Sequence, residues 1–433
     1  MKSDAPISPE LLQKYWLVSA DMGYGHQRAI SPLICLSHSG NIINANKSPE
    51  ASAKELRLWK EMQGTYEFMS RAGNLPLIGN FITRLLNRLL YIPSYYPLKE
   101  RSNATLQVMY LKSAIKKGLC DGIIKQISNP ELPLITSFYS SAIAAEMAGH
   151  KFIYCIICDS DASRAWAPID PKNSRIKFLL PTEMVRKQFL MYGVKPENIY
   201  VTGFPLPNEN VGVNKKIALK DLARRIPVLD PKNIYQKHYE SLLEGIEKDN
   251  TIVADARPVA ITYAVGGAGA QKEIGALILE KLTPKIKAGE IKINLVAGSR
   301  KDIKEYFEKV IKKLKLNGQK GIEIIYAPDK IEYFKKFNIC LRETDILWTK
   351  PSELSFYCAL GLPIIISTPV GSQEEYNREW LISSGGGIDN LDPRYVDEWL
   401  SDLLNSGRLA HAAVDGFLNA EQLGTYNIKK IIL

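Results

Sequence analysis

The amino-acid sequence predicts an α/β protein that folds into two parallel-sheet domains, and three observations support this. At 433 residues the chain is too long for one hydrophobic core of ordinary size. Short runs rich in Val, Ile and Leu alternate with segments of helical period, as in βαβ units. This alternation occurs twice, on either side of a stretch rich in Pro, Asn and Lys. We therefore expect an N-terminal Rossmann-like domain, a linker with an insertion, a second Rossmann-like domain and a C-terminal helical segment, at residues 1–205, 206–257, 258–390 and 391–433.

Apolar runs place the strands and periodic segments place the helices. In the first half we expect strands at 15–20, 132–136, 152–157 and 176–180, and helices at 27–36, 141–149 and 183–192. In the second half we expect strands at 259–265, 291–297, 322–326, 345–349 and 363–367, and helices at 271–286, 301–314, 331–336 and 354–360. Trp399, Leu403 and Leu404 recur at helical spacing and predict a terminal helix.

The net charge indicates which kinds of partner the protein binds, and the placement of the cysteines indicates the cellular compartment. The excess of 56 Lys and Arg over 46 Asp and Glu favours anionic partners. Nucleic acid is not expected among them, because the sequence shows no basic recognition helix or aromatic stacking motif. The six cysteines are scattered through apolar stretches, which favours a reducing cytoplasm over a disulfide framework. Cys155 and Cys158 have CxxC spacing, but on a strand they would point to opposite faces, so we predict core positions.

The first candidate loop follows the first predicted strand. Gly23 and Gly25 precede His26, and Arg28 lies two residues further into a predicted helix. Glycines let the backbone approach a ligand, and a helix N-terminus favours negative charge. The imidazole of His26 titrates near neutral pH and could act as a general base. The alternative is a tight turn in which His26 caps or packs.

The second candidate loop lies between the strand predicted at 259–265 and the next helix. It contains Gly266, Gly267 and Gly269. The pattern fits neither the dinucleotide fingerprint nor the P-loop, yet its backbone amides could hold a diphosphate. A bare turn would need fewer glycines, so we predict a phosphate-binding role.

Polar side chains crowd the ends of the last two predicted strands, as a sugar site requires. Gln373 and Asn377 are four residues apart, hence on one helix face. Ser352 and Glu353 could instead cap the helix that begins there. The candidates in this region are Ser352, Glu353, Gln373, Glu374 and Asn377.

Taken in order, these loops resemble the GT-B glycosyltransferases that include the peptidoglycan enzyme MurG and the monogalactosyl- and diglucosyl-diacylglycerol synthases. The likeness spans about residues 15–387. Its motifs are the GYGH loop at 23–26, GVKPENIYVTGFP at 193–205, GGAG at 266–269, Lys350-Pro351, GLP at 361–363 and GSQEEYN at 371–377. The resemblance implies two Rossmann-like domains that face a central cleft.

The resemblance also implies roles. His26 would be the base on the acceptor side, the glycine-rich loop at 266–269 would lie near the diphosphate of a UDP-sugar, and Gln373 and Asn377 would contact the donor hexose. The UDP-sugar would be a co-substrate, and neither a metal nor another cofactor is implied. Asp159 and Asp161, in a stretch that resembles the family's Asp-containing segment, could orient His26 or serve as base; a structural turn is the alternative.

Two positions depart from the family pattern. The family usually carries a Glu for the donor ribose where this chain has Phe356, and Glu353 is the nearest substitute. Tyr139 stands where lipid-glycan members tend to carry His-Pro.

A membrane contact is predicted at residues 75–91, an apolar segment with interspersed Arg. Such a segment can lie in an anionic membrane interface, or it can be a core helix with exposed arginines. The N-terminus lacks a signal-peptide pattern and no run of 18 apolar residues occurs, so we expect a cytoplasmic protein, peripheral on the inner face of the membrane.

The sequence thus predicts a metal-independent hexosyltransferase that acts from a UDP-sugar on an acceptor hydroxyl, of a lipid or a cell-envelope glycan. Two alternatives stay open: a UDP-sugar 2-epimerase on the same fold, and a non-catalytic nucleotide-sugar-binding protein, which the Phe356 departure favours.

Overall fold

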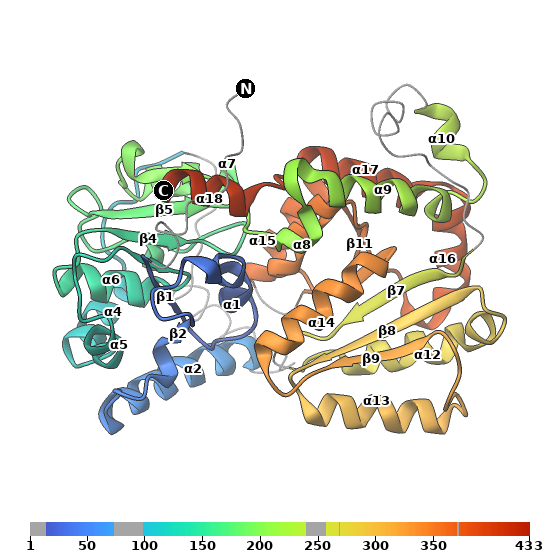
Figure 1. Ribbon diagram of the computed structural model, residues 1–433, viewed down its shortest axis with the longest axis horizontal. Coiled ribbons are helices and arrows are strands. Elements are labelled where there is room, and N and C mark those ends of the chain that lie inside the picture. The colour runs from blue at the N-terminus through green and yellow to red at the C-terminus, as the bar shows by residue number, and fades with distance from the viewer. Residues whose placement is uncertain (1–13, 73–97, 240–256, 268, 370–371) are drawn as a thin grey trace. The chain divides into compact units, whose positions relative to one another are not determined.

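A computed structural model describes residues 14–72, 98–239, 257–267, 269–369 and 372–433 (Figure 1). The chain forms two compact units. The first unit comprises residues 1–205, 370–373 and 423–433, and the second comprises residues 206–369 and 374–422.

The first unit is built on a six-stranded, wholly parallel sheet in the order β2-β1-β3-β4-β5-β6. The four predicted strands are confirmed, and two short edge strands join them. The strands are β1 (Trp16–Ser19), β2 (Ile43–Asn44), β3 (Leu134–Thr136), β4 (Ile153–Ile156), β5 (Ile176–Leu180) and β6 (Ile199–Val201).

Helices cover this sheet. The helix predicted at 27–36 is α1 followed by a 3-10 helix that contains Pro32, whose ring and missing N–H disfavour a longer α-helix. Thr105 and Thr182 cap α4 and α7 by accepting hydrogen bonds from the N–H groups of Val108 and Val185. The elements are α1 (Gly25–Ile30), η2 (Ser31–Leu36), η3 (Ala45–Lys47), α2 (Ala53–Ala72), α4 (Leu106–Lys116), α5 (Asp121–Gln126), α6 (Tyr139–Met147), η4 (Arg164–Trp166), α7 (Glu183–Met191) and η5 (Pro196–Asn198).

The second unit repeats this plan with a parallel sheet in the order β12-β11-β10-β7-β8-β9. The five predicted strands are confirmed, with β12 added at one edge. The strands are β7 (Val259–Ala264), β8 (Ile291–Gly298), β9 (Ile322–Tyr326), β10 (Ile346–Thr349), β11 (Ile364–Ile366) and β12 (Gly387–Asp389).

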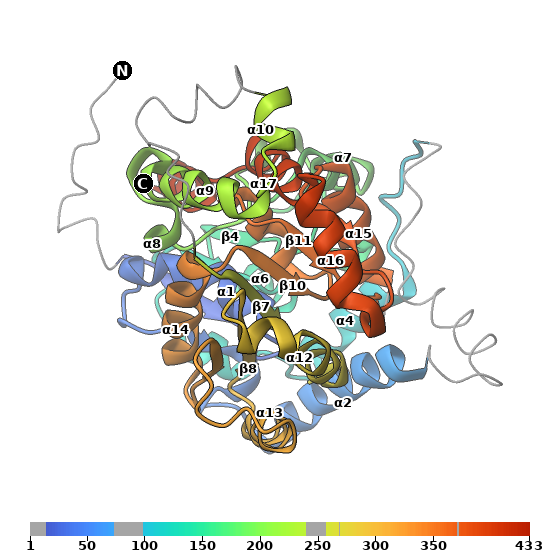
Figure 2. The same ribbon diagram turned by 90° about the vertical axis from the view of Figure 1, so that its right-hand side faces the viewer.

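Helices lie on both faces of the second sheet. Figure 2 shows β7 and β8 between α14 on one side and α12 on the other. The helix predicted at 354–360 is of the 3-10 type and all of its residues are buried. The elements are α12 (Lys272–Lys287), α13 (Lys301–Lys313), α14 (Lys330–Glu343), η7 (Glu353–Leu360), α15 (Ser372–Ser383), η8 (Pro393–Tyr395), α16 (Val396–Asn405) and α17 (Arg408–Asn419).

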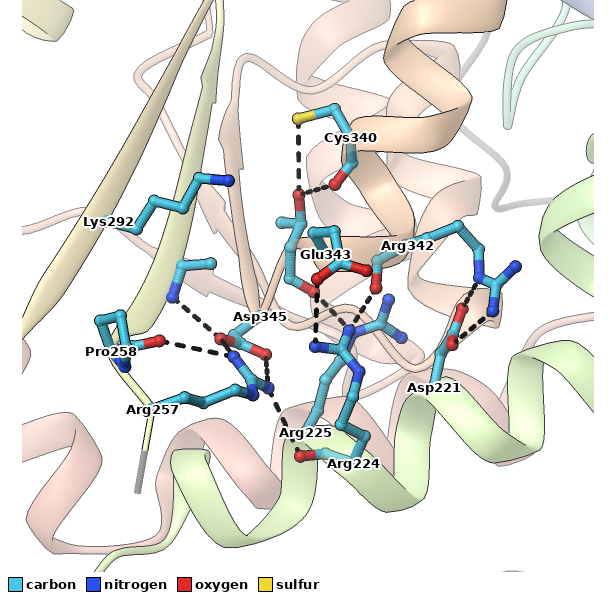
Figure 3. A network of polar contacts seen from close by, with 12 residues as sticks. Asp221, Arg224, Arg225, Arg257, Pro258, Lys292, Cys340, Arg342, Glu343 and Asp345 are labelled. Carbon is cyan, nitrogen blue, oxygen red and sulfur yellow. Dashed lines mark hydrogen bonds and ion pairs between the residues drawn. The ribbon is translucent and has the colours of Figure 1, made fainter. Parts of the chain in front are cut away.

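The segment predicted as a linker, residues 206–257, contributes helices to the second unit: α8 (Asn208–Val211), η6 (Val213–Lys215), α9 (Lys216–Leu229) and α10 (Ile234–His238). Arg225 on α9 is 1% exposed (Figure 3). Its guanidinium donates to the carbonyls of Leu341 and Thr344 at the end of α14, and of Leu360 at the end of η7, at 2.7–2.9 Å. One cation therefore binds backbone carbonyls at the ends of two helices.

Ion pairs reinforce this attachment. Asp221 on α9 pairs with Arg342 at the end of α14. Arg257, just before β7, holds Asp345 with two hydrogen bonds of 2.6 Å (Figure 3). Burial lowers the pKa of Arg225 to about 10, so it remains charged at neutral pH.

The C-terminal helix α18 (Gly424–Ile432) belongs to the first unit. Asn427 donates to the carbonyl of Thr202 at 2.9 Å, and the hydroxyl of Tyr15 donates to the carbonyl of Ile432 at 2.5 Å. A Cβ at Gly424 would lie 2.1 Å from the carbonyl oxygen of Phe204, so only glycine fits there.

None of the helices in the described ranges is both long and apolar enough to cross a membrane. The predicted membrane segment, 75–91, lies outside the described residues.

Candidate functional site

The loop of residues 21–25 carries the chain from the end of β1 into α1. Gly23 has a φ of +117°, which a residue with a side chain rarely adopts. Asn46 holds the start of the loop, because its side chain accepts from the N–H of Asp21 at 2.8 Å and donates to the carbonyl of Asp21 at 3.1 Å. Lys47 forms an ion pair with the Asp21 carboxylate at 2.5 Å. The fixed loop sets His26 in the first turn of α1.

The hydrogen bonding of His26 defines its tautomer. Nδ1 lies 2.8 Å from the carbonyl oxygen of Ser137, at the end of β3. A carbonyl can only accept, so Nδ1 carries the hydrogen and donates it. In the neutral ring Nε2 then has the free lone pair.

Aromatic rings surround His26. The imidazole meets the ring of Phe138 edge to face at a centroid distance of 4.8 Å, and Trp166 lies 6.1 Å away. Tyr139, the position that departs from the family pattern, packs between Phe138 and Trp166 at 4.7 and 5.0 Å. Burial lowers the pKa of His26 to about 4, against a raising contribution from the Ser137 carbonyl. The ring is therefore neutral at pH 7.

The two predicted carboxylates differ. Asp161 is fully buried, and neither of its carboxyl oxygens has a hydrogen-bond partner within the described ranges. Burial, with the nearby charge of Asp159, raises its pKa well above the usual range. This favours the neutral acid, which is a poor base. Asp159 is linked to His26 indirectly: its Oδ2 lies 3.8 Å from Cys158 Sγ, which lies 3.2 Å from His26 Nδ1.

The other predicted loop residue, Arg28, is 4% exposed and lies with its guanidinium 5.7 Å from the ring centre of Tyr24. It is thus placed in the core of the first unit rather than on its surface. Gly25 opens α1 directly before His26.

In the second unit the glycine-rich loop follows β7 and precedes the 16-residue helix α12. The N–H of Gly269 donates to the carbonyl of Gly266 at 2.8 Å and closes a turn. Gly269 has a φ of +75°. Gln271 anchors the far end, because its side chain donates to the carbonyl of Thr368 at 2.8 Å and its carbonyl accepts from the Tyr263 hydroxyl at 2.6 Å. The loop therefore lies at the positive end of a long helix.

Two cationic side chains lie against this loop. A Cβ on Gly266 would come 2.6 Å from Cε of Lys350, and a Cβ on Gly269 would come 3.2 Å from the guanidinium carbon of Arg300. Lys350 directly follows β10, and Arg300 lies two residues beyond β8. Those strands flank β7 in the sheet. Sequence reasoning missed Arg300 and gave Lys350 no role, because only the strand order brings them beside the loop.

Acidic partners hold both cations in place. Lys350 forms an ion pair with Glu374, one of the predicted sugar-binding residues. Arg300 is bound by the carboxylate of Asp302 through hydrogen bonds of 2.9 and 2.7 Å. Both cationic side chains are thus held beside the loop, each as part of an ion pair with a carboxylate.

The remaining predicted donor residues lie on η7 and α15. Glu353 is 9% exposed and Asn377 is 1% exposed, whereas Gln373 and Ser352 are half-buried. Ser352 makes no side-chain capping hydrogen bond to η7, although it precedes that helix. Capping therefore does not account for Ser352.

Phe356 occupies an apolar contact. It is 3% exposed and its ring lies 4.7 Å from that of Trp380 on α15. The side chain at this position therefore stabilises the packing of η7 against α15 and offers nothing to a ribose hydroxyl.

The last features of the site to consider are possible metal ligands and cavities. Within the described ranges, no group of three or more His, Cys, Asp or Glu side chains could hold a metal ion. A cavity of about 260 Å³ in the first unit is lined by α4, α6 and residues 168–174, and contains none of the predicted site residues.

Two parallel α/β units, each with a glycine-containing loop after its first strand, define a glycosyltransferase-like GT-B fold, and the predicted fold class is confirmed. The chain is 22% identical over 233 residues to a processive diacylglycerol β-glucosyltransferase of Bacillus licheniformis. This match covers 53% of the chain and 49% of the relative, about half the length of each. The predicted resemblance to diacylglycerol glycosyltransferases is thus confirmed as a distant similarity over about half of the chain.

A family model described as a domain of unknown function (DUF6938) matches residues 234–319 and 312–430. Among solved structures, the UDP-GlcNAc 2-epimerase from Neisseria meningitidis bound to UDP-GlcNAc is 13% identical, with 96% of this chain and 98% of that chain covered and a TM-score of 0.48. MurG of Acinetobacter baumannii is 15% identical, with 97% and 99% covered and a TM-score of 0.43.

Proposed function

We propose that this chain is a metal-independent glycosyltransferase that moves a hexose from a UDP-sugar to an acceptor hydroxyl. The observation that carries the proposal is the glycine-rich loop after β7, with Lys350 and Arg300 lying against it at the N-terminus of α12. A diphosphate needs backbone that it can approach closely and positive charge beside it, and the glycines together with Lys350 and Arg300 support such a site. The lysine and arginine would provide the charge that a metal ion provides elsewhere.

His26 is the proposed base. Its Nε2 accepts the proton of the acceptor hydroxyl, and the hydroxyl oxygen forms a bond to the anomeric carbon of the donor while the bond from that carbon to the diphosphate breaks. The loop amides, Lys350 and Arg300 stabilise the charge that appears on the diphosphate. Gln373 and Asn377 would hold the hexose, and the outcome is inversion at the anomeric carbon.

The acceptor is proposed to be a lipid or a cell-envelope glycan. The name of the Bacillus licheniformis relative assigns diacylglycerol to that protein, and the net charge of +10 suits contact with an anionic membrane surface. We accordingly propose a cytoplasmic enzyme, peripheral on the inner face of the membrane.

The test is binding of UDP to the full chain by calorimetry, compared with Lys350→Met and Arg300→Met. Each variant removes a charge-assisted contact of about 1.5–3 kcal/mol, so the dissociation constant should rise roughly 10- to 100-fold. Lys301→Met is the matched control. The side chain of Lys301 is 79% exposed, and this variant removes the same charge from the residue next to Arg300. Equal affinity in all four proteins would contradict the proposed phosphate site.

Product analysis with UDP-glucose, UDP-galactose and UDP-N-acetylglucosamine then tests the reaction. Transfer, or slow donor hydrolysis that needs His26, supports the transferase. A free 2-epimerised hexosamine without an acceptor would identify an epimerase instead, and UDP binding without turnover would identify a binding protein.

A further inference from the structure

The imidazole of His26 is held by residues from the two strands that follow β1 in the sheet. Ser137 lies just beyond β3 and presents its carbonyl oxygen 2.8 Å from Nδ1. Cys158 lies just beyond β4 and presents its sulfur 3.2 Å from the same nitrogen. The strands β1, β3 and β4 are neighbours, so one nitrogen meets two groups at one edge of the sheet.

The hydrogens can be assigned at this point. Nδ1 donates its hydrogen to the Ser137 carbonyl, and the sulfur of Cys158 is a second, weaker acceptor on the same N–H. The thiol of Cys158 then donates its own hydrogen to the carboxylate of Asp159, whose Oδ2 lies 3.8 Å from the sulfur. The contacts run from carboxylate to thiol to imidazole, and none of them involves Nε2.

We infer that Cys158 is a positioning residue for His26: its sulfur lies against Nδ1 and holds the ring in the orientation that leaves Nε2 free to accept a proton. The catalytic part of this inference rests on the proposed function. Cys158 does not itself touch substrate, because it is 2% exposed.

The other cysteine of the CxxC pair, Cys155, serves as an internal control. Cys155 lies within β4 and is fully buried, and burial strongly raises the pKa of its thiol. It is a core thiol, as the sequence predicted for both residues. For Cys158 that prediction is correct about burial but incomplete, because the side chain also contacts a polar ring.

The tautomer of His26 can be measured directly, without substrate. In protein labelled with ¹⁵N-histidine, long-range ¹H–¹⁵N spectra distinguish protonated from unprotonated ring nitrogens, and His26→Gln assigns the signals. We expect hydrogen on Nδ1 in the native protein and in Cys158→Ser, whose oxygen can still accept. In Cys158→Ala and in Cys158→Val we expect the ring signals of His26 to shift, because the ring loses the sulfur contact that fixes its orientation, whereas Nδ1 keeps its hydrogen on the Ser137 carbonyl. Cys155→Ala should leave the spectrum unchanged.

Turnover gives a second readout. Hydrolysis of UDP-hexose by Cys158→Ala should show kcat lowered about tenfold with KM for the donor unchanged, since a displaced base loses part of its catalytic contribution. Unchanged His26 signals in both folded Cys158 variants would overturn the inference. Normal turnover by His26→Gln would instead contradict the proposed function, and the spectra would still decide the role of Cys158.

Discussion

The loop after β1 and the loop after β7 each follow the first strand of their unit along the chain, yet different side chains surround them. His26 is half-buried against the rings of Phe138 and Trp166, and burial lowers its pKa to about 4, so that it is neutral. The loop at Gly266 has almost no side chains of its own and has Lys350 and Arg300 against it. The same strand-loop-helix unit can therefore lie against either an imidazole among aromatic rings or a pair of cationic side chains, according to what the neighbouring strands bring to it.

The largest expected effect comes from a substitution in the first unit alone, at His26. His26→Gln should lower turnover of a UDP-hexose by about 10²- to 10⁴-fold, the usual contribution of a positioned base. Affinity for UDP should not change, because the anion site belongs to the second unit. Steady-state kinetics and calorimetry on the same protein measure both quantities, with the exposed His38→Gln as control. A parallel fall in UDP affinity would contradict the assignment of the base to the first unit and of UDP binding to the second.

A smaller effect tests whether the position of Phe356, on η7, can supply the ribose carboxylate that the family usually carries there. Phe356→Glu should lower the free energy of unfolding by about 2–4 kcal/mol, because it puts a carboxyl against Trp380 in an apolar contact. It should not strengthen UDP binding. Urea unfolding and calorimetry give the two values, with Phe356→Leu as the apolar control. Tighter UDP binding by the Glu variant would show that this position still faces the nucleotide.

The backbone of the second loop can be tested through Gly269. Gly269→Ala should cost about 1–2 kcal/mol of stability, because its φ of +75° strains a residue with a side chain. It should also weaken UDP binding, since the new methyl meets Arg300. Gly289→Ala is the matched control: its φ is +76° and nothing lies within 4 Å of the added Cβ. Both variants should lose stability, but only Gly269→Ala should lose affinity.

The smallest expected effect is the contribution of His26 to the pH dependence of the free energy of unfolding. The folded pKa of His26, about 4, is below its unfolded value of 6.5, so the unfolded chain takes up the proton first as the pH falls. The stability due to the neutral ring is present above pH 6.5 and is lost progressively toward pH 4. Between pH 7 and 5.5 we expect His26→Gln to be less acid-sensitive than the native chain by about 1 kcal/mol. Urea unfolding at both pH values measures this, and equal slopes would show that His26 is not desolvated.

The sequence predicts the interior strands well, because their apolar runs reflect burial on both faces. The edge strands β2 and β12 are only two and three residues long and half-buried, so they leave no such run. The linker prediction at 206–257 overlooked α9, whose Arg225 looks solvent-exposed in sequence but is enclosed by carbonyl groups.

The candidate sites show the same limit. Glycines, His26 and the polar run at 352–377 are visible in the sequence because they follow predicted strands. Their partners are not: Arg300, Lys350 and Cys158 become relevant only through the order in which strands lie side by side. Side-chain identity at the strand ends is a local property, whereas adjacency in the sheet comes from distant parts of the chain.

The docking of α18 has a consequence for synthesis of the protein. Domains that are continuous in sequence can fold in the order in which they leave the ribosome. Here the first unit needs its last eleven residues, 423–433, which emerge only after the whole second unit has been made. The second unit can therefore complete its fold while the first still lacks a helix, and Gly424 and Asn427 close the unit that began the chain. A chain that ended before residue 423 would contain every residue of the second unit but would lack the helix that completes the first.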